Sequence, residues 1–421
     1  MRLRFATSKT GGIIDLFLMA YCRSMGLQLS SRRLYLPARG LTTALALGFA
    51  LLYSRELGVV NRGYLAAIMT FTILTLVLFT SGTTLTLRNL SAKGDFHPNF
   101  FAFKSLIIIE CFFALIFFVF EILLFSILKN NLPVPLFFVS IVYFFASAMH
   151  LISLEILIAL NLFKEASKFE ILTVLSQMSF YIFFTKVTPF STAIGLLLSF
   201  AISGAMISTV ILIRHRNALG GWKSFSPPFM FLKKTKGNHS IGAVQGIIDV
   251  SDRIIITWLL PVAYLAQYSV MTSFISFFRF APDAYSKIIV SQKIENYRTL
   301  FTKSHLIIGS VILASMFMVI ASRFSITHLL GPDWILPWGV SILFAMQELV
   351  RGSFQVSGAM RISLGDSTIV NRASLGLVAV GIPVSVITTS LFGIYGVPLG
   401  FILTYVALIF IMNHRRVSGD V

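Results

Sequence analysis

Apolar runs of about 20 residues recur along this chain from Tyr35 to Met412, and each is long enough to cross the hydrocarbon of a bilayer as a helix. Hydrophobic residues make up 56% of the chain and charged residues only 12%, which is outside the range of soluble domains. Membrane-spanning β-strands would instead appear as alternating segments of about ten residues, a pattern that this sequence does not have. The sequence therefore predicts an all-α polytopic membrane protein.

The runs divide into about twelve transmembrane spans, six on either side of a basic connection that contains Gly220-Gly221 and Pro227-Pro228. A turn is predicted at 55–63, and the spans are predicted at about Tyr35–Tyr53, Tyr64–Leu85, Ser105–Leu128, Val134–Leu160, Ile171–Phe184, Thr192–Ile213, Ile241–Leu260, Tyr264–Val290, His305–Ser322, Ile335–Gly358, Ile369–Leu391 and Ile394–Met412. Such a composition is typical of a flexible linker. Met25 is an alternative start within the first segment. The predicted segments are a cytoplasmic leader at 1–34, an N-terminal lobe at 35–213, a linker at 214–240, a C-terminal lobe at 241–412 and a tail at 413–421.

A weak internal repeat supports two related lobes. Leu57-Gly58 precedes Gly63-Tyr64 by the same spacing with which Pro261-Val262 precedes Gln267-Tyr268, a displacement of 204. Gly63-Tyr64-Leu65-Ala66 against Ala263-Tyr264-Leu265-Ala266 gives a displacement of 200 instead. Six spans in each repeat preserve orientation across the membrane, so the two lobes should be parallel and should enclose a central cavity.

Most of the 34 Lys and Arg residues fall in the leader, in alternate connections and in the tail. This asymmetry is the positive-inside pattern, and it predicts cytoplasmic termini in an inner (plasma) membrane. The net charge of +18 therefore reports topology, and we expect the bilayer, rather than nucleic acid, as a partner.

Charged residues inside the apolar stretch 242–290 are the main functional clue. Helical spacing places polar side chains on one face of the second half of this stretch, namely Tyr268, Thr272, Ser276, Arg279, Asp283 and Ser286. The first half carries Asp249, Asp252 and Arg253. Each charge would cost about 2.5–3.5 kcal/mol if it faced lipid near the bilayer centre. We therefore expect these residues to face a protein interior or an aqueous cavity.

The candidate substrate-binding residues are four arginines at membrane depth, together with one tyrosine: Arg39, Arg253, Arg279, Arg351 and Tyr268. The planar donor fork of Arg suits phosphate oxygens. The alternative is that each arginine is a structural ion-pair partner, with Asp249 or Asp252 for Arg253, Asp283 for Arg279 and Glu348 for Arg351. The same acids are candidates for coupling transport to H⁺ or Na⁺.

Three further ionisable residues lie in predicted spans. Glu110 and Glu121 share one helix face, either as neutral acids bonded within the bundle or as coupling groups. His150 lies one turn from Ser147, either as a hydrogen-bonded core residue or as part of a proton relay.

Four short motifs occur in order along the chain. They are Leu57-Gly58 with Gly63-Tyr64, Asp252-Arg253 with Tyr268-Ser269, Leu330-Gly331-Pro-Asp-Trp334, and Leu391-Phe-Gly393-Ile-Tyr-Gly396. Together they resemble the O-antigen type of polysaccharide-biosynthesis flippase, in the multidrug/oligosaccharidyl-lipid/polysaccharide exporter superfamily. The resemblance implies two six-helix lobes that alternate between inward and outward openings. It also implies a lipid-linked oligosaccharide as substrate and polysaccharide assembly proteins as partners. Gln267 departs from the small residue usual in its turn.

Three functions compete. The first is export of an isoprenoid-diphosphate-linked oligosaccharide, the second is antiport of drugs or cations by the same fold, and the third is a membrane glycan polymerase or ligase. The third would need large external loops with catalytic acids, whereas the predicted external loops are short. Motifs for ATP hydrolysis, a nucleophile or a metal do not occur in the sequence, so we expect no enzyme activity and no cofactor beyond a coupling ion.

Overall fold

The computed structural model describes residues 35–93, 119, 134–188, 190–215, 244, 246–290, 319–363 and 367–414. Within these ranges the chain is helical apart from short connections, and it contains no strand. The all-α fold class predicted from the sequence is confirmed. The third predicted span, with Glu110 and Glu121, and nearly all of the basic linker lie outside the described residues.

The first lobe is a bundle of four described helices: α2 (Tyr35–Lys93), α4 (Val134–Ala159), α5 (Phe163–Lys186) and α6 (Thr192–Arg214). Helix α2 consists of two membrane-length helices joined at a sharp kink, where Gly58 has φ 71° and ψ 168°. Glycine takes this left-handed conformation without the steric cost that a Cβ would bring. The turn predicted at 55–63 is therefore tighter than expected, with helix on both sides of Gly58.

The second lobe begins with a helix at 246–259, which ends before Pro261, and continues through α8 (Val262–Val290) and a helical stretch at 319–329. Its remaining elements are η3 (Pro332–Trp334), α10 (Trp338–Ser363), α11 (Ser367–Gly376), η4 (Leu377–Gly381), α12 (Ile382–Phe392), η5 (Gly393–Tyr395) and α13 (Gly396–His414). Element η4 is a π-helical turn that interrupts the predicted eleventh span between α11 and α12. Gly331 and Gly393, from two of the sequence motifs, also have positive φ.

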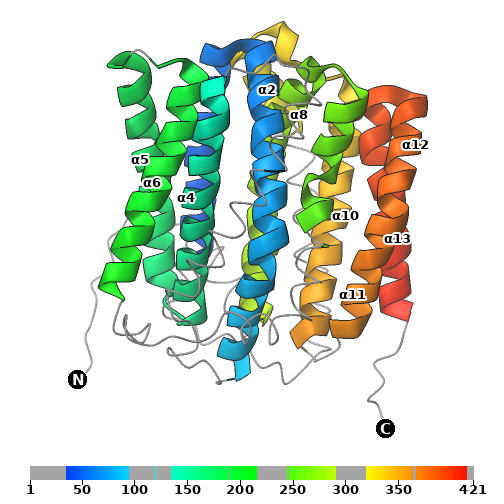
Figure 1. Ribbon diagram of the computed structural model, residues 1–421. Helices are drawn as coiled ribbons and strands as arrows, with labels where there is room; N and C mark the ends of the chain where they lie inside the picture. The colour runs from blue at the N-terminus through cyan, green and yellow to red at the C-terminus, as the bar shows by residue number, and fades with distance from the viewer. Residues whose placement is uncertain are drawn as a thin grey trace, which may run out of the picture.

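The turns predicted to be external gather at one end of the molecule, which is uppermost in Figure 1. Lys186 at the end of α5 pairs with Glu56 of α2 at 3.2 Å. Gln267 of α8 donates to the backbone carbonyl of Asp333 at 2.7 Å. We call this end the upper end.

Helices α2 and α8 run side by side in the middle of the molecule and join the lobes, with α4, α5 and α6 on one side and α10 to α13 on the other (Figure 1). One buried apolar core crosses this junction, because Ala66 and Ala67 of α2 pack with Leu265 and Phe344 of the second lobe. Two further cores lie inside the first lobe. Four described helical stretches are long and apolar enough to cross a membrane: Ala38–Leu78, Phe138–Ala159, Thr192–Arg214 and Thr368–Ile411.

Candidate functional site

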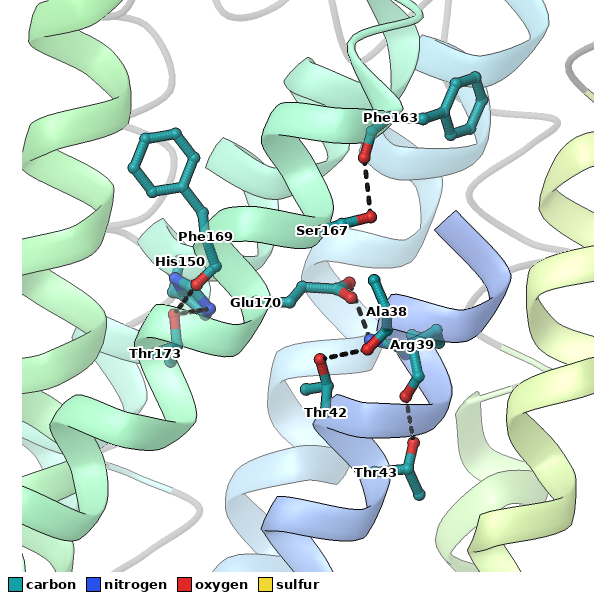
Figure 2. Close-up of polar contacts among 10 residues, drawn as sticks. All are labelled: Ala38, Arg39, Thr42, Thr43, His150, Phe163, Ser167, Phe169, Glu170 and Thr173. Carbon is teal, nitrogen blue, oxygen red and sulfur yellow. Dashed lines mark hydrogen bonds and ion pairs between the residues drawn. The ribbon is translucent and has the colours of Figure 1, made fainter. Parts of the chain in front are cut away.

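In the first lobe, Arg39 of α2 donates to Glu170 of α5 at 2.8 Å (Figure 2). The Glu170 side chain is 4% exposed and the Arg39 side chain 27% exposed. Thr43, one turn after Arg39, bonds the Arg39 carbonyl rather than the guanidinium. Arg39 is thus the more exposed partner of a buried acid. Sequence reasoning missed Glu170 because it placed the start of this span at Ile171, whereas α5 begins at Phe163.

His150 of α4 lies in the same lobe, with Nε2 3.4 Å from the hydroxyl of Thr173 on α5 (Figure 2). Thr173 also donates to the backbone carbonyl of Phe169. Ser176 and Ser203 are hydrogen-bonded to each other between α5 and α6. Nδ1 of His150 is buried without a hydrogen-bond partner among the described residues, so both alternatives for His150, a core residue or part of a proton relay, stay predictions.

In the second lobe, Arg351 of α10 forms an ion pair with Asp249 of the 246–259 helix. Its Nη1 lies 3.7 Å from Glu348, the partner predicted one turn away on the same helix. The side chain of Arg351 is 11% exposed and that of Glu348 is 3% exposed, whereas that of Asp249 is 49% exposed. We call these three residues the second-lobe triad. It places two carboxylates around one guanidinium, for a net charge of about −1 when both acids are ionised.

Two members of the triad, Asp249 and Arg351, line a small cavity of about 40 Å³. Beside Asp249 and Arg351, the cavity is lined by Ile248, Phe354, Gln355, Leu377 and Tyr405. Leu377 begins the π-helical turn, a type of distortion that is frequent at functional sites. Gln355 and Tyr405 were not singled out from the sequence, because neither interrupts its apolar span with a charge.

Next to the triad, the buried carboxylate of Asp252 accepts a hydrogen bond from the Tyr268 hydroxyl at 2.8 Å. It also accepts one from the backbone N–H of Arg253 at 2.8 Å. Tyr268 is fully buried against Phe344, with ring centroids 4.6 Å apart. A substrate could reach Tyr268 only after these helices separate, so its predicted binding role stays a prediction.

The polar stripe predicted along α8 faces the protein wherever its side chains are described. Tyr268, Thr272 and Ser286 are all buried, as the cost of exposing polar groups to lipid requires. The side chains of Arg279 and Asp283 lie outside the described part of α8, and their predicted pairing stays a prediction. Arg253 is half-buried on the 246–259 helix.

The candidate residues thus fall into two groups. Asp249 and Arg351 meet at a cavity in the second lobe, with Glu348 behind Arg351 and with Asp252 and Tyr268 nearby, while Arg39 lies apart in the first lobe. Within the described residues, no group of three His, Cys, Asp or Glu side chains is placed to hold a metal ion. The arrangement places two carboxylates within reach of a single guanidinium.

No protein-family model and no curated protein matches this sequence. Solved structures do match over nearly the whole chain. A point mutant of the Vibrio cholerae MATE transporter VcmN matches with a TM-score of 0.68 at 11% identity, over 94% of this chain and 96% of that one. The chain has the MATE transporter fold.

Two further structures agree with this result. The eukaryotic MATE transporter AtDTX14 matches with a TM-score of 0.67 at 12% identity, over 95% of this chain and 97% of that one. An outward-facing multidrug resistance MATE family transporter of the MOP superfamily matches with a TM-score of 0.62 at 12% identity, over 91% and 94%. At such identities the likeness establishes the fold, and the substrate has to be argued from this chain's own residues.

Proposed function

We propose that this chain is a membrane exporter that works by alternating access between its two lobes and is coupled to a cation. The MATE fold across 94% of the chain is the observation that carries the proposal. In such a fold the transported molecule enters between two lobes, and the cavity opens to one side of the membrane at a time. The proposed orientation has both termini in the cytoplasm, with the upper end facing outward.

The triad supports the coupling step. Because Arg351 has two carboxylate partners, a cation bound at the half-exposed Asp249 leaves the guanidinium paired with Glu348. Arg351 therefore does not become an unpaired buried charge, which would cost about 3–5 kcal/mol. A coupling ion acts only through a difference in its affinity for the inward and outward states, and movement of Arg351 between two acids supplies such a difference.

Among substrate classes, the drug or cation class is favoured by two observations. The matched structures include a multidrug resistance transporter, and the acids of the triad outnumber its arginine. Arg39 and Arg351, two of the four candidate arginines, are each already neutralised by a carboxylate. The expectation of a cationic cavity for an anionic substrate is weakened accordingly.

A lipid-linked oligosaccharide is the second candidate substrate. The ordered motifs that resemble polysaccharide-biosynthesis flippases favour it, as do the amide of Gln355 and the phenol of Tyr405 beside Arg351 in the cavity. These groups donate and accept hydrogen bonds, as sugar hydroxyls require. Polysaccharide assembly proteins would be the partners in that case.

One reconstitution experiment separates these candidates. Proteoliposomes are given either a fluorescent organic cation or an isoprenoid-diphosphate-linked oligosaccharide, each with and without an imposed proton or sodium gradient. Gradient-driven movement of the organic cation supports antiport, and translocation of the oligosaccharide supports the flippase. Failure to move either class of substrate, by protein that is folded and correctly inserted, would reject the proposed exporter.

A second experiment tests the orientation in the membrane. A reporter fused after Lys236 should lie on the cytoplasmic side, and a reporter inserted within 187–191 should lie on the outer side.

A further inference from the structure

The two lobes touch at the upper end through a residue that has no side chain. A Cβ built on Gly63 of α2 would overlap the backbone oxygen of Val262 and would lie 2.8 Å from its Cγ2. Real Cβ atoms essentially never come so close to a backbone oxygen, and a backbone oxygen cannot rotate away. At this point α2 and α8 can meet as they do only if residue 63 is glycine.

The contact continues down the same face of α2. Ala66 is 4% exposed and Ala67 is 0% exposed, and both pack in the core that crosses the junction. Farther along, a Cβ on Gly246 would overlap Cγ1 of Val77. Small residues thus let the two lobes approach each other closely over several helical turns.

A separate set of contacts fixes the segment that carries Gly63. The buried Arg62 donates from Nε to the Ser54 hydroxyl at 3.2 Å and from Nη2 to the Tyr53 hydroxyl at 3.3 Å. Its guanidinium also lies 5.0 Å from the centre of the Tyr53 ring. Both partners belong to the helix before the kink, so Arg62 ties together the two halves of α2.

The repeated turn in the second lobe makes a different contact. In the register that aligns Tyr64 with Tyr268, Gln267 occupies the position of Gly63, and it donates to the carbonyl of Asp333 within its own lobe. The first copy of the turn thus supplies the position without a side chain, Gly63, and the second copy supplies Val262 from a different position of the turn. This asymmetry points to Gly63 as a specialised contact rather than as one of two equivalent packing positions.

We propose that the Gly63–Val262 contact is the latch of a gate at the upper end, closed in this structure, and that Arg62 is the positioning residue that aligns it. The inference rests on the proposed function in that a gate matters only to alternating access. A side chain at residue 63 holds the lobes apart and shifts the population toward the state that is open at this end. Without Arg62 the two halves of α2 are no longer tied together at the kink. Loss of Arg62 therefore also shifts the population toward the state that is open at the upper end.

The test measures access to the interface rather than transport. In a background with Cys22 and Cys111 replaced by Ser, Ala66→Cys reports on the junction and Leu197→Cys, which replaces a 0% exposed residue, reports on the interior of the first lobe. A membrane-impermeant maleimide is added from outside. We expect Gly63→Ala to raise the labelling rate at position 66 at least about tenfold, equivalent to a shift of roughly 1.4 kcal/mol in the opening equilibrium, and to leave position 197 unlabelled.

Matched controls come from the same helix and the same junction. Gly48→Ala adds a Cβ that meets nothing within 4 Å, so labelling should match that of the parent. Gly246→Ala is the contrasting variant: its added Cβ would overlap Val77 far from the upper end, so it should not raise labelling from outside at position 66. If Gly63→Ala does not reach the membrane, Arg62→Met takes its place, with Arg62→Lys expected to recover part of the closure.

Unchanged labelling at position 66 in folded Gly63→Ala protein would overturn the latch. Equal increases at positions 66 and 197 would also overturn it, because they would show that the first lobe had unfolded. If labelling changes as expected while no substrate moves in the proteoliposome assay, the gate stands and the exporter proposal fails.

Discussion

The two lobes differ in which member of the ion pair is buried. In the first lobe the acid, Glu170, is buried and its arginine is partly exposed, whereas in the second lobe Arg351 is buried and Asp249 is half-exposed at a cavity. Arg351 also has Glu348 as a second partner, while within the described part of the chain Glu170 has a single ion pair, to Arg39. A guanidinium between two carboxylates can release one of them to a ligand at low cost, while a buried carboxylate paired with an arginine of another helix holds the two helices together. Under the proposed function, the exchange of charge partners belongs to the second lobe, and the ion pair of the first lobe holds its helices in place.

The largest effect is expected at Arg351. Arg351→Ala leaves Glu348 buried without its cation, which costs about 3–5 kcal/mol, and it removes the guanidinium from the cavity. Transport in proteoliposomes should be lost and the thermal midpoint in detergent should fall. Arg351→Lys restores the positive charge but not the planar guanidinium that contacts Asp249 and Glu348 through different nitrogens, so it should restore only part of the transport activity. Wild-type transport by folded Arg351→Ala would remove the triad from the mechanism.

Arg39→Ala should lower the free energy of unfolding, because the buried carboxylate of Glu170 loses its arginine. Breaking a buried pair costs about 3–5 kcal/mol, and we expect a value near the lower end because Arg39 itself is partly hydrated. Transport per folded molecule should stay near that of wild type. The double variant Arg39→Met with Glu170→Leu should regain most of the lost stability, since an apolar pair replaces the charges. Thermal unfolding and a transport assay on the same preparation measure both quantities. Loss of transport in the stable double variant would show that the first lobe also exchanges partners.

Asp249→Asn should change stability by less than about 1 kcal/mol, because the carboxylate is half-exposed and Arg351 keeps Glu348. Its effect should appear in coupling: substrate movement should no longer respond to an imposed proton or sodium gradient. Glu348→Gln is the contrasting variant, and it should lose more stability because Glu348 is 3% exposed. A wild-type gradient response in Asp249→Asn would place the coupling site elsewhere.

The smallest effect concerns pH at the upper end of the first lobe, where Glu56 lies in the turn between the two halves of α2. Burial raises the pKa of Glu56, but hydrogen bonds from Tyr181 and Lys186 outweigh it, and the net pKa lies below the ordinary value of 4.5. A carboxyl with a lowered pKa stabilises the folded state above its unfolded pKa, and this contribution disappears as the pH falls through the folded pKa. Thermal midpoints measured from about pH 6 down to about pH 3, a range that brackets the usual Glu pKa, should fall less steeply for Glu56→Gln than for wild type. Identical slopes would show that Glu56 does not contribute.

Much of the fold follows from the order of apolar and polar residues. Helix α4, predicted from Val134 to Leu160, is observed from Val134 to Ala159, and α6, predicted from Thr192 to Ile213, is observed from Thr192 to Arg214. The hydrocarbon thickness fixes span length, and turn residues fix the ends, so both are local properties that a sequence carries directly. The burial of Tyr268 and Thr272 followed from the same local argument, since polar groups on a span avoid lipid.

The choice of ion-pair partner between different helices was decided by tertiary structure alone. The sequence predicted Glu348 beside Arg351, because residues three apart on a helix are neighbours. It did not predict that Arg351 would pair with Asp249, 102 residues away, or that Arg39 would pair with Glu170, 131 residues away. Helix packing sets which faces meet, and no local pattern encodes that choice. The sequence by itself therefore determined an all-helical membrane chain with charges turned inward, while the packing of the helices decided which charges are fixed and which one opens onto a cavity.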